Sequence, residues 1–336
     1  MSALVPVAEA LGEALASLTP PAPVAMAVNE ALGKVVAEDI PAPGARPTHM
    51  VALRQGFAVE SLATVGASPE SPVLLARAPV AVAIDDALPD HCDAVLPRDA
   101  VCATGSRFEI IQVVAPGEGV RRIGHDLAEG EVIARGGATM SPSLQLVLQA
   151  AGFETVPIIA PRIAIAAGPP AAEAWLGRMI ATLGCVPANC HDTDIVIAWT
   201  GSADPRLALR PGDTAMIAPT GGGRVTVTLP ERFDGLIAGF VALVLPAIAV
   251  LSRRQIRLEK RPLRQKIASV IGTTDCVLLQ STQRGYVPLA TGEITLAALA
   301  GADAFTLVPP ESEGMPAGQP IAATPFDAML EEQEKP

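Results

Sequence analysis

Aromatic residues are scarce in this chain. They make up 3% of its 336 residues, whereas apolar residues of all kinds make up 50%. Ala, Val, Leu and Ile must therefore build the core, as they do in α/β and small β domains. The chain is also longer than one hydrophobic core usually serves, so two to four domains are expected. Its 32 prolines and 29 glycines predict many short elements joined by turns.

Runs of basic residues are lacking as well. No stretch has more than two consecutive Lys or Arg residues, and the formal net charge is -11. A nucleic-acid-binding protein needs a basic surface for the phosphate backbone, so neither DNA nor RNA is an expected partner. The acidic residues are spread along the chain, and residues 331–336 are expected to form a solvated acidic tail.

Paired cysteine motifs are missing, and so is a basic and apolar signal segment at the N-terminus. These two features predict a reducing, cytoplasmic location. Cys185, Cys190 and His191 could supply three ligands to a metal ion, but no fourth ligand has the spacing to join them. Buried or incidental thiols are therefore expected, and no metal site is predicted. The cysteines are Cys92, Cys102, Cys185, Cys190 and Cys276.

Only one hydrophobic run approaches the length of a membrane span. It covers Gly235 to Leu251, contains Pro246, and is followed by Arg253 and Arg254. Seventeen residues are marginal for a hydrocarbon core of about 30 Å. A helix buried in an α/β domain is the favoured interpretation, and no membrane partner is expected.

The N-terminal half has two kinds of segment. Apolar spacing predicts amphipathic helices at residues 4–18 and 28–37, and a helix directly after Ser141-Pro142-Ser143. Between them, residues 57–115 consist of short β-type runs and turns, with no helix needed. This pattern predicts a β domain inserted into a helical and β segment.

The C-terminal half begins with a parallel α/β pattern. Residues 162–167 and 195–199 are apolar strands, and a helix is predicted between them at 171–184. Gly221-Gly222-Gly223-Arg224 is best explained as a hairpin turn, because the Lys-Ser/Thr of a phosphate loop does not follow. Residues 256–324 return to short strands.

The predicted fold is therefore α/β and multi-domain. Its parts are an N-terminal helical and β domain, an inserted β domain, an α/β domain, a terminal β domain and an acidic tail. Their predicted boundaries are 1–53 with 114–160, then 54–113, 161–254, 255–330 and 331–336.

Six collinear stretches resemble one family, the molybdopterin molybdenumtransferases, which include bacterial MoeA and the E domain of gephyrin. ALGKVVAEDI at 31–40 resembles the family's ALGRVLAEDI, and LPDHCDAVLP at 88–97 resembles LPEGADAVV. The most specific is GEGVRRIGHDLAEG at 117–130, which resembles GENIRRAGEDIKKG. The others are PRIAI at 161–165, LRPG at 209–212 and TGEITLAALAGAD at 291–303.

The resemblance implies both an architecture and an activity. It implies an elongated homodimer whose chain carries an inserted β domain, an α/β/α molybdopterin-binding domain and a C-terminal β barrel. It also implies use of adenylylated molybdopterin and molybdate, hydrolysis of the adenylate with Mg²⁺, and release of molybdenum cofactor. The stretch 161–251 is shorter than the family's domain, which implies the loss of at least one βα unit.

Several positions that carry the family's chemistry are replaced. Gln55 stands where the MDGYA motif has its catalytic Asp, and an amide is a far weaker Mg²⁺ ligand than a carboxylate. Asp85 and Asp86 replace part of the TGAP segment; they could form a new metal site, but adjacent acids in a turn are more often solvated. Asp126 matches the acid of the family's GEDI and is the remaining catalytic candidate.

Candidate ligand contacts also follow from the resemblance. The family's TGDEL is reduced to a segment around Gly168, and its PGNPVS loop becomes Pro230 to Gly235, in which Arg232 could replace lost backbone donors or pair with its acidic neighbours. A turn at the carboxyl end of a parallel strand is a usual ligand position, although it could be only a turn. The predicted contacts to pterin or phosphate are Thr200, Gly201, Ser202, Asp204, Gly168, Arg121, Arg122, Arg210 and Arg232.

Three functions fit this pattern. The first is a degenerate member that binds molybdopterin, molybdenum cofactor, a molybdoenzyme or a maturation protein, without efficient molybdenum insertion. The second is an active enzyme that uses relocated acids, namely Asp85, Asp86, Asp126 and Asp204, with Mg²⁺. The third is a structural partner of another protein.

Overall fold

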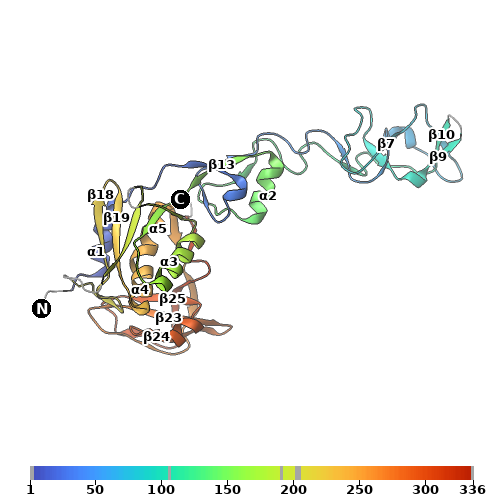
Figure 1. The fold of residues 1–336 in the computed structure, drawn as a ribbon. Helices are drawn as coiled ribbons and strands as arrows, with labels where there is room; N and C mark the ends of the chain where they lie inside the picture. Colours follow the sequence, from blue (N-terminus) through green and yellow to red (C-terminus); the bar gives the residue numbers. More distant parts are fainter. Residues whose placement is uncertain (1–3, 105–106, 190–191, 201–205, 334–336) are drawn as a thin grey trace. The chain divides into compact units, whose positions relative to one another are not determined.

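A computed structural model describes residues 4–104, 107–189, 192–200 and 206–333. Its internal contacts divide the chain into two compact units, each built from separate stretches (Figure 1). The finer division into four domains and a tail remains a prediction. The larger unit contains Met1–Glu38, Arg135–Leu146 and Phe153–Pro336, and the smaller contains Asp39–Ala134 and Val147–Gly152.

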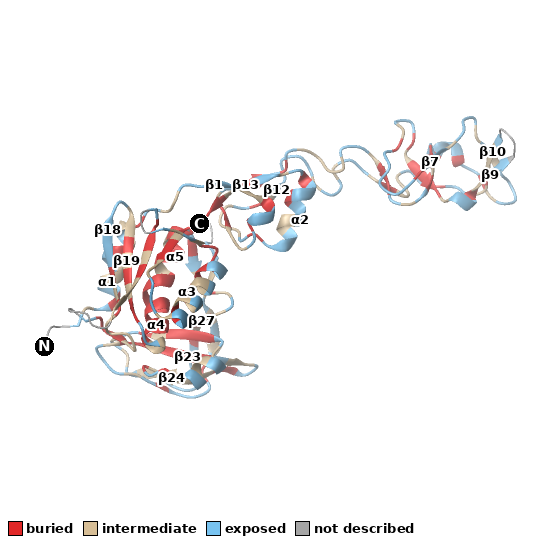
Figure 2. Cartoon of the chain, in the orientation of Figure 1, coloured by how far each residue is buried: buried red, intermediate tan, exposed pale blue. Residues whose placement is uncertain are grey.

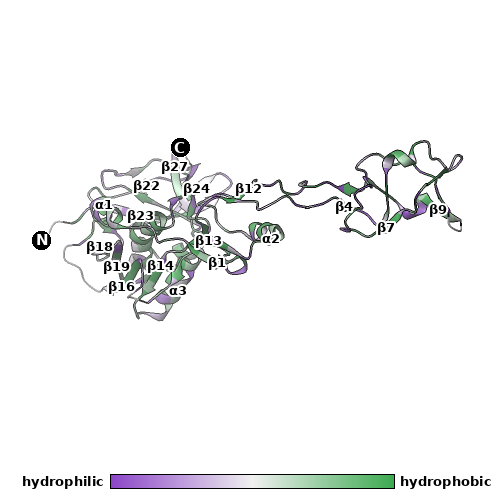
Figure 3. Cartoon of the chain, turned by 90° about the horizontal axis from the view of Figure 1, so that it is seen from above, coloured by the Kyte–Doolittle hydropathy of each residue, from purple (hydrophilic) through white to green (hydrophobic). Residues whose placement is uncertain are grey.

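A five-stranded sheet, in the order β15-β14-β16-β19-β18, forms the centre of the larger unit. The first four strands are parallel, and β18 runs antiparallel to β19. Hydrophobic residues run along β14 and β16 (Figure 3), as in parallel strands covered on both faces, whereas β19 alternates buried apolar residues with threonines. The predicted parallel α/β pattern and the hairpin turn between β18 and β19 are confirmed. The strands are β14 (Arg162–Ile165), β15 (Val186–Pro187), β16 (Ile195–Thr200), β18 (Met216–Gly221) and β19 (Arg224–Pro230).

Helices pack against this sheet. Helix α1 (Val7–Ser17) lies against β18 and β19, and α3 (Pro170–Thr182) lies against β14 and β15. Both confirm helices predicted from apolar spacing.

Helix α2 (Pro142–Ala151) also begins where the Ser141 side chain was expected to cap it, with the Leu144 N–H donating to Ser141 Oγ at 3.1 Å.

The hydrophobic run ending at Leu251 is a helix in the core of the larger unit. It consists of α4 (Phe233–Gly239), the π-helical segment η4 (Phe240–Val244) and α5 (Leu245–Leu251). In its most hydrophobic 18-residue window, 83% of the residues are buried, as the colours along α4 and α5 show (Figure 2). Pro246 lacks an N–H and would clash with the carbonyl four residues earlier, which accounts for the π-helical widening directly before it. The buried-helix interpretation is confirmed.

The helix expected at residues 28–37 does not form. A 3-10 turn, η1 (Val28–Glu30), is followed by strand β2 (Val35–Val36). Gly33 has a positive φ of 74°, which interrupts a right-handed helix, and β2 then pairs with β13 (Thr155–Ile159). Strand β1 (Val24–Ala27) pairs with the opposite edge of β13. Tertiary pairing therefore overrides the local helical pattern.

The C-terminal strands form an open sheet in the order β17-β23-β25-β27-β21, with β24 also paired to β23. No closed barrel forms among the described residues, which corrects the expected terminal barrel. Strand β21 pairs with β27, and Leu263 directly after it forms an isolated parallel bridge with Tyr286 of β24. The strands are β17 (Leu209–Arg210), β21 (Glu259–Pro262), β23 (Thr274–Thr282), β24 (Gly285–Thr291), β25 (Ala304–Val308) and β27 (Pro320–Pro325).

The remaining C-terminal elements are short. Strand β20 (Arg254–Ile256) pairs with β28 (Leu330–Glu332), so the backbone at the start of the acidic stretch is a paired strand, while the side chains of Glu331 and Glu332 are exposed as expected. Gln255 Nε2 also donates to Glu331 Oε1 at 3.1 Å. Strands β22 (Ile267–Ala268) and β26 (Gly314–Met315) form a further pair, and helix α6 is Leu296–Gly301.

The smaller unit consists of short strands around small apolar clusters. Its sheets have the orders β7-β5-β8, β6-β10-β9, β11-β4 and β12-β3. Within the described residues of 54–113, the helical elements are only the 3-10 turns η2 (Ser61–Thr64) and η3 (Arg98–Ala100), as expected. The strands are β3 (Ile40–Pro41), β4 (Val51–Ala52), β5 (Gly56–Val59), β6 (Val73–Leu74), β7 (Val80–Val82), β8 (Ala94–Leu96), β9 (Val101–Thr104), β10 (Arg107–Ile110), β11 (Val120–Arg121) and β12 (Val132–Ala134).

Because two thiols are buried, we expect the folded protein to lose stability at alkaline pH. Burial raises the pKa of Cys185 and of Cys276 to about 12, from 9.0. Above pH 9 the unfolded thiols ionise while the folded ones stay protonated, so the free energy of unfolding falls by ~1.4 kcal/mol per pH unit for each thiol. Urea unfolding at pH 8 and pH 10.5 measures this loss.

The control compares the pH-dependent loss of stability in the wild type with that in variants whose cysteines are replaced by alanine. Cys185→Ala with Cys276→Ala should show a smaller loss between the two pH values, whereas Cys102→Ala should lose as much as the wild type because Cys102 is exposed. An unchanged loss in the double variant would contradict the assignment to these thiols.

Candidate functional site

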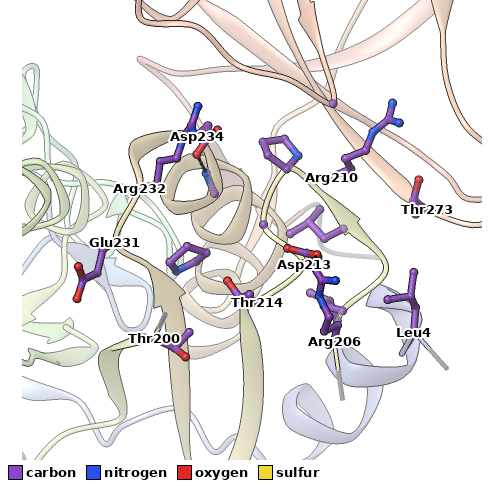
Figure 4. Close-up of a pocket in the computed structure, with 17 residues that line it drawn as sticks. Leu4, Thr200, Arg206, Arg210, Asp213, Thr214, Glu231, Arg232, Asp234 and Thr273 are labelled. Carbon is purple, nitrogen blue, oxygen red and sulfur yellow. Dashed lines mark hydrogen bonds and ion pairs between the residues drawn. The ribbon is translucent and has the colours of Figure 1, made fainter. Parts of the chain in front are cut away.

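A cavity of about 870 Å³ lies within the larger unit. Thr200 at the end of β16 and Pro230 at the end of β19 line it, together with the loop 206–214, the start of α4, and single residues before β23 and after β24 (Figure 4). In open α/β sheets, ligands bind beyond the carboxyl ends of the strands. This cavity is therefore the best candidate site.

An ion pair holds Arg210 at the cavity wall. Its Nη2 pairs at 2.9 Å with the Oδ2 of Asp275, whose side chain is 0% exposed. Ser269 Oγ donates to the same carboxylate at 2.8 Å. A Cβ on Gly292 would lie 2.4 Å from Arg210 Nε, so the absence of a side chain there leaves room for the guanidinium. Arg210 remains 40% exposed, and its Nε is buried without a hydrogen-bond partner among the described residues.

Two further arginines line the cavity, and each is paired with a neighbouring acid. Arg206 pairs with Asp213, and Arg232 Nε pairs with Asp234 Oδ2 at 2.9 Å. Glu231 is exposed and is in no ion pair among the described residues. The lining thus carries three guanidinium groups and three carboxylates, and of these arginines Arg210 is the one whose paired acid lies outside the lining.

The cavity brings together only part of the predicted set. Thr200, Arg210 and Arg232 all line it. The predicted contacts Gly201, Ser202 and Asp204 lie outside the described residues, as do Cys190 and His191.

The surroundings of Gly168 are already filled by the chain itself. Its N–H donates to the carboxylate of Glu173, and a Cβ there would lie 2.1 Å from Trp199 Nε1. The indole N–H of Trp199 donates to the carbonyl of Ala166 at 2.8 Å. Because Pro169 and Pro170 have no N–H, few backbone donors remain at this strand end. The role of Gly168 in ligand binding stays a prediction.

Gln55, which the resemblance aligns with the family's acid, lies in the smaller unit. Gln55 is exposed between Arg54 and Gly56. Arg54 donates from Nε to the Val95 carbonyl at 3.0 Å and pairs with Glu118 at 3.1 Å. The backbone N–H of Ala115, and then Arg54, lower the pKa of Glu118. The loop is therefore anchored by Arg54, while the side chain of Gln55 is left to the solvent.

The other predicted residues of the smaller unit form local contacts. Arg121 pairs with Asp126 at 3.0 Å, both being about half exposed, and Arg122 lies against Gly117, where a Cβ would meet its Nη2 at 2.8 Å. The ion pair with Arg121 orients Asp126, whose catalytic role stays a prediction.

Asp85 and Asp86 form a turn. Asp86 Oδ2 accepts from the Ala83 N–H at 2.7 Å, and Asp85 has a positive φ of 68°. No group of three or more His, Cys, Asp or Glu side chains that could hold a metal ion occurs among the described residues.

Several residues that line the cavity or support its wall escaped prediction from sequence. Arg206 precedes Arg210 by four residues, and that spacing on the approach to Pro211-Gly212 was an available signal. Asp275 and Gly292 lie far from Arg210 in sequence and reach it only through strand pairing and folding, so no local pattern could have linked them. Asp234 was noted only as a possible partner of Arg232.

Comparisons with known proteins identify relatives of the N-terminal region. Residues 5–152 match the family model of the MoeA N-terminal region, domains I and II. A protein of Methanocaldococcus jannaschii whose name places it in molybdopterin biosynthesis is 30% identical over 140 residues, which are 39% of this chain and 35% of that protein. Molybdopterin molybdenumtransferase 2 of Mycobacterium tuberculosis is 26% identical over 154 residues, 41% of this chain and 38% of the relative. The match therefore spans little more than a third of each relative.

Solved structures share the fold over nearly the whole chain. The molybdopterin biosynthesis MoeA protein of Pyrococcus horikosii has a TM-score of 0.75 and 22% identity, covering 96% of this chain and 99% of that one. A second structure, from Pyrococcus horikoshii OT3, has a TM-score of 0.69 and 21% identity, covering 96% and 100%. At these identities the likeness shows the MoeA-like fold alone.

The position of Arg210 beside Gly292 can be tested by substitution. Gly292→Ala should displace the guanidinium and weaken binding of inorganic phosphate by at least about tenfold, because a charge-assisted hydrogen bond is worth roughly 1.5–3 kcal/mol. Calorimetric titration with phosphate measures the change.

Gly318→Ala is the matched control. Gly318 has a φ of 86°, close to the 63° of Gly292, but a Cβ there would meet nothing within 4 Å. Both variants should lose about 1 kcal/mol of stability from the left-handed backbone, and only Gly292→Ala should lose phosphate binding. Equal binding by the two variants would contradict the role of Gly292.

Proposed function

Because the chain belongs to the MoeA family through its N-terminal region, we propose that it binds molybdopterin or molybdenum cofactor without efficient molybdenum insertion. Its place in molybdenum cofactor biosynthesis is supported by the family match and by the names of its relatives. The cavity at the ends of β16 and β19, with Arg210 fixed in its wall, is the observation that carries the proposal.

The chemistry of the cavity suits a phosphorylated ligand. A guanidinium presents five N–H donors in a planar fork, and Asp275 accepts from only one nitrogen of Arg210. Because Nε is buried, only the terminal nitrogens of the guanidinium can offer donors to a phosphate at the exposed side. Thr200 and Thr214 add hydroxyl groups to the same wall.

The Mg²⁺-dependent step does not fit the described residues. Gln55 supplies a neutral amide where the family has a carboxylate, and the described part of the chain offers no cluster of three acids or histidines. Hard divalent cations prefer several oxygen ligands that include carboxylates. The proposed function is therefore ligand binding without Mg²⁺-dependent hydrolysis of the adenylate.

Titration with adenylylated molybdopterin tests this function. The metal-free protein should bind the ligand and, after addition of Mg²⁺ and molybdate, release no AMP. Arg210→Met should weaken binding by at least about tenfold, since one phosphate contact from a charged donor is lost. Arg284→Met is the control, because Arg284 is an exposed arginine that does not line the cavity.

The two other possible results of this titration would favour the two alternative functions. Release of AMP would overturn the binding proposal and favour an active enzyme with relocated acids such as Asp85, Asp86, Asp126 or Asp204. No binding at all would favour a structural partner.

The resemblance also motivates a proposal about assembly. We propose a cytoplasmic homodimer that contacts a molybdoenzyme or a cofactor-maturation protein. A monomeric mass in sedimentation equilibrium would contradict the homodimer.

A further inference from the structure

Asp234 engages two hydrogen-bond donors at the wall of the cavity. Its Oδ2 accepts from Arg232 Nε at 2.9 Å, and its Oδ1 accepts from the N–H of Gly235 at 2.8 Å. All three residues line the cavity, and Figure 4 shows the Arg232 and Asp234 side chains together at the start of α4. The Asp234 side chain is only 13% exposed. One carboxylate thus accepts from a guanidinium and a backbone amide at once.

This arrangement has the hydrogen bonds of a bound oxyanion. Tetrahedral oxyanions such as phosphate and molybdate are held by charged guanidinium donors and backbone N–H groups. At Arg232 and Gly235 the same two kinds of donor converge, but the oxygen atoms belong to the chain. An external anion could use these donors only by displacing Asp234 and would also meet its negative charge.

Arg210 differs in where its acid lies. Asp275 is completely buried and does not line the cavity, whereas Arg210 does. The carboxylate therefore holds Arg210 from behind and leaves the cavity side of the guanidinium open. Asp234, by contrast, is itself part of the cavity wall.

We propose that Asp234 is a specificity-determining residue that occupies the oxyanion position at Arg232, as Asp213 occupies the guanidinium of Arg206. The wild-type protein then accepts a single tetrahedral oxyanion, at Arg210, and excludes a second. The inference deepens the proposed function and rests on it for the identity of the natural ligand. With Asp234 in place, the protein would bind a ligand through one phosphate at Arg210 and would not bind molybdate at the same time.

Oxyanion binding by variants tests the proposal without any pterin. Equilibrium dialysis with inorganic phosphate, and separately with molybdate after saturation with phosphate, gives the number of anions bound per chain. The wild type should bind one. Asp234→Ala should bind two, with at least about a tenfold gain in affinity at the second position, because it releases one charged and one backbone donor.

Glu231→Ala is the matched control. It removes one negative charge from the same loop, but Glu231 holds no ion-pair partner among the described residues. It should still bind one anion. Two anions bound by Glu231→Ala, or by the wild type, would overturn the proposal, because net charge or open space would then explain the result.

A second substitution at Asp234 keeps the test valid if Asp234→Ala does not fold. Asp234→Asn keeps the shape of the side chain and an acceptor for Gly235 but loses the ionic pair with Arg232, so it should bind a second anion with a smaller gain. If thermal melting shows both variants folded and neither binds a second anion, the proposal is wrong. Failure of adenylylated molybdopterin to bind the wild type would not alter these results, so the two proposals fail separately.

Discussion

Burial of the helix from Phe233 to Leu251 is the constraint on which the candidate site depends. Its apolar residues fill the core of the larger unit beside β19, and burial of this kind is the main favourable term in folding. Because the body of the helix is fixed, its first residues have a fixed position at the cavity. The same element therefore stabilises the unit and places Asp234 and Gly235 at the wall.

Elements with a strong, unbroken pattern could be predicted from the sequence. Strands β14 and β16 are continuous apolar runs, and α1 and α3 have one apolar face, so their type and approximate bounds followed from periodicity. The errors arise where distant pairing decides the structure. Residues 35–36 were expected to be helical but pair with β13, and residues 331–332 were expected to begin a tail but pair with β20 while their side chains stay exposed. Both outcomes depend on partners that a local pattern does not contain.

The candidate site was predictable to a similar degree. Thr200, Arg210 and Arg232 could be selected because they follow strands or stand in segments with a recognisable pattern. The groups that hold them could not. Asp275 becomes the partner of Arg210 because β17 and β23 pair in parallel register, and Gly292 approaches the guanidinium only in the folded chain. The sequence thus indicated side chains that line the cavity better than it indicated the residues that support them.

The contact between Glu173 and Gly168 has a consequence for any anion that approaches the end of β14. The carboxylate of Glu173 accepts a hydrogen bond from the N–H of Gly168, and the two residues are only five positions apart in the chain. The effective concentration of this carboxylate at the N–H is therefore on the order of millimolar or higher. A free anion of equal intrinsic affinity must exceed that concentration to take its place. The chain therefore sets a threshold at this strand end below which dilute anions in solution leave Gly168 bound to its own acid.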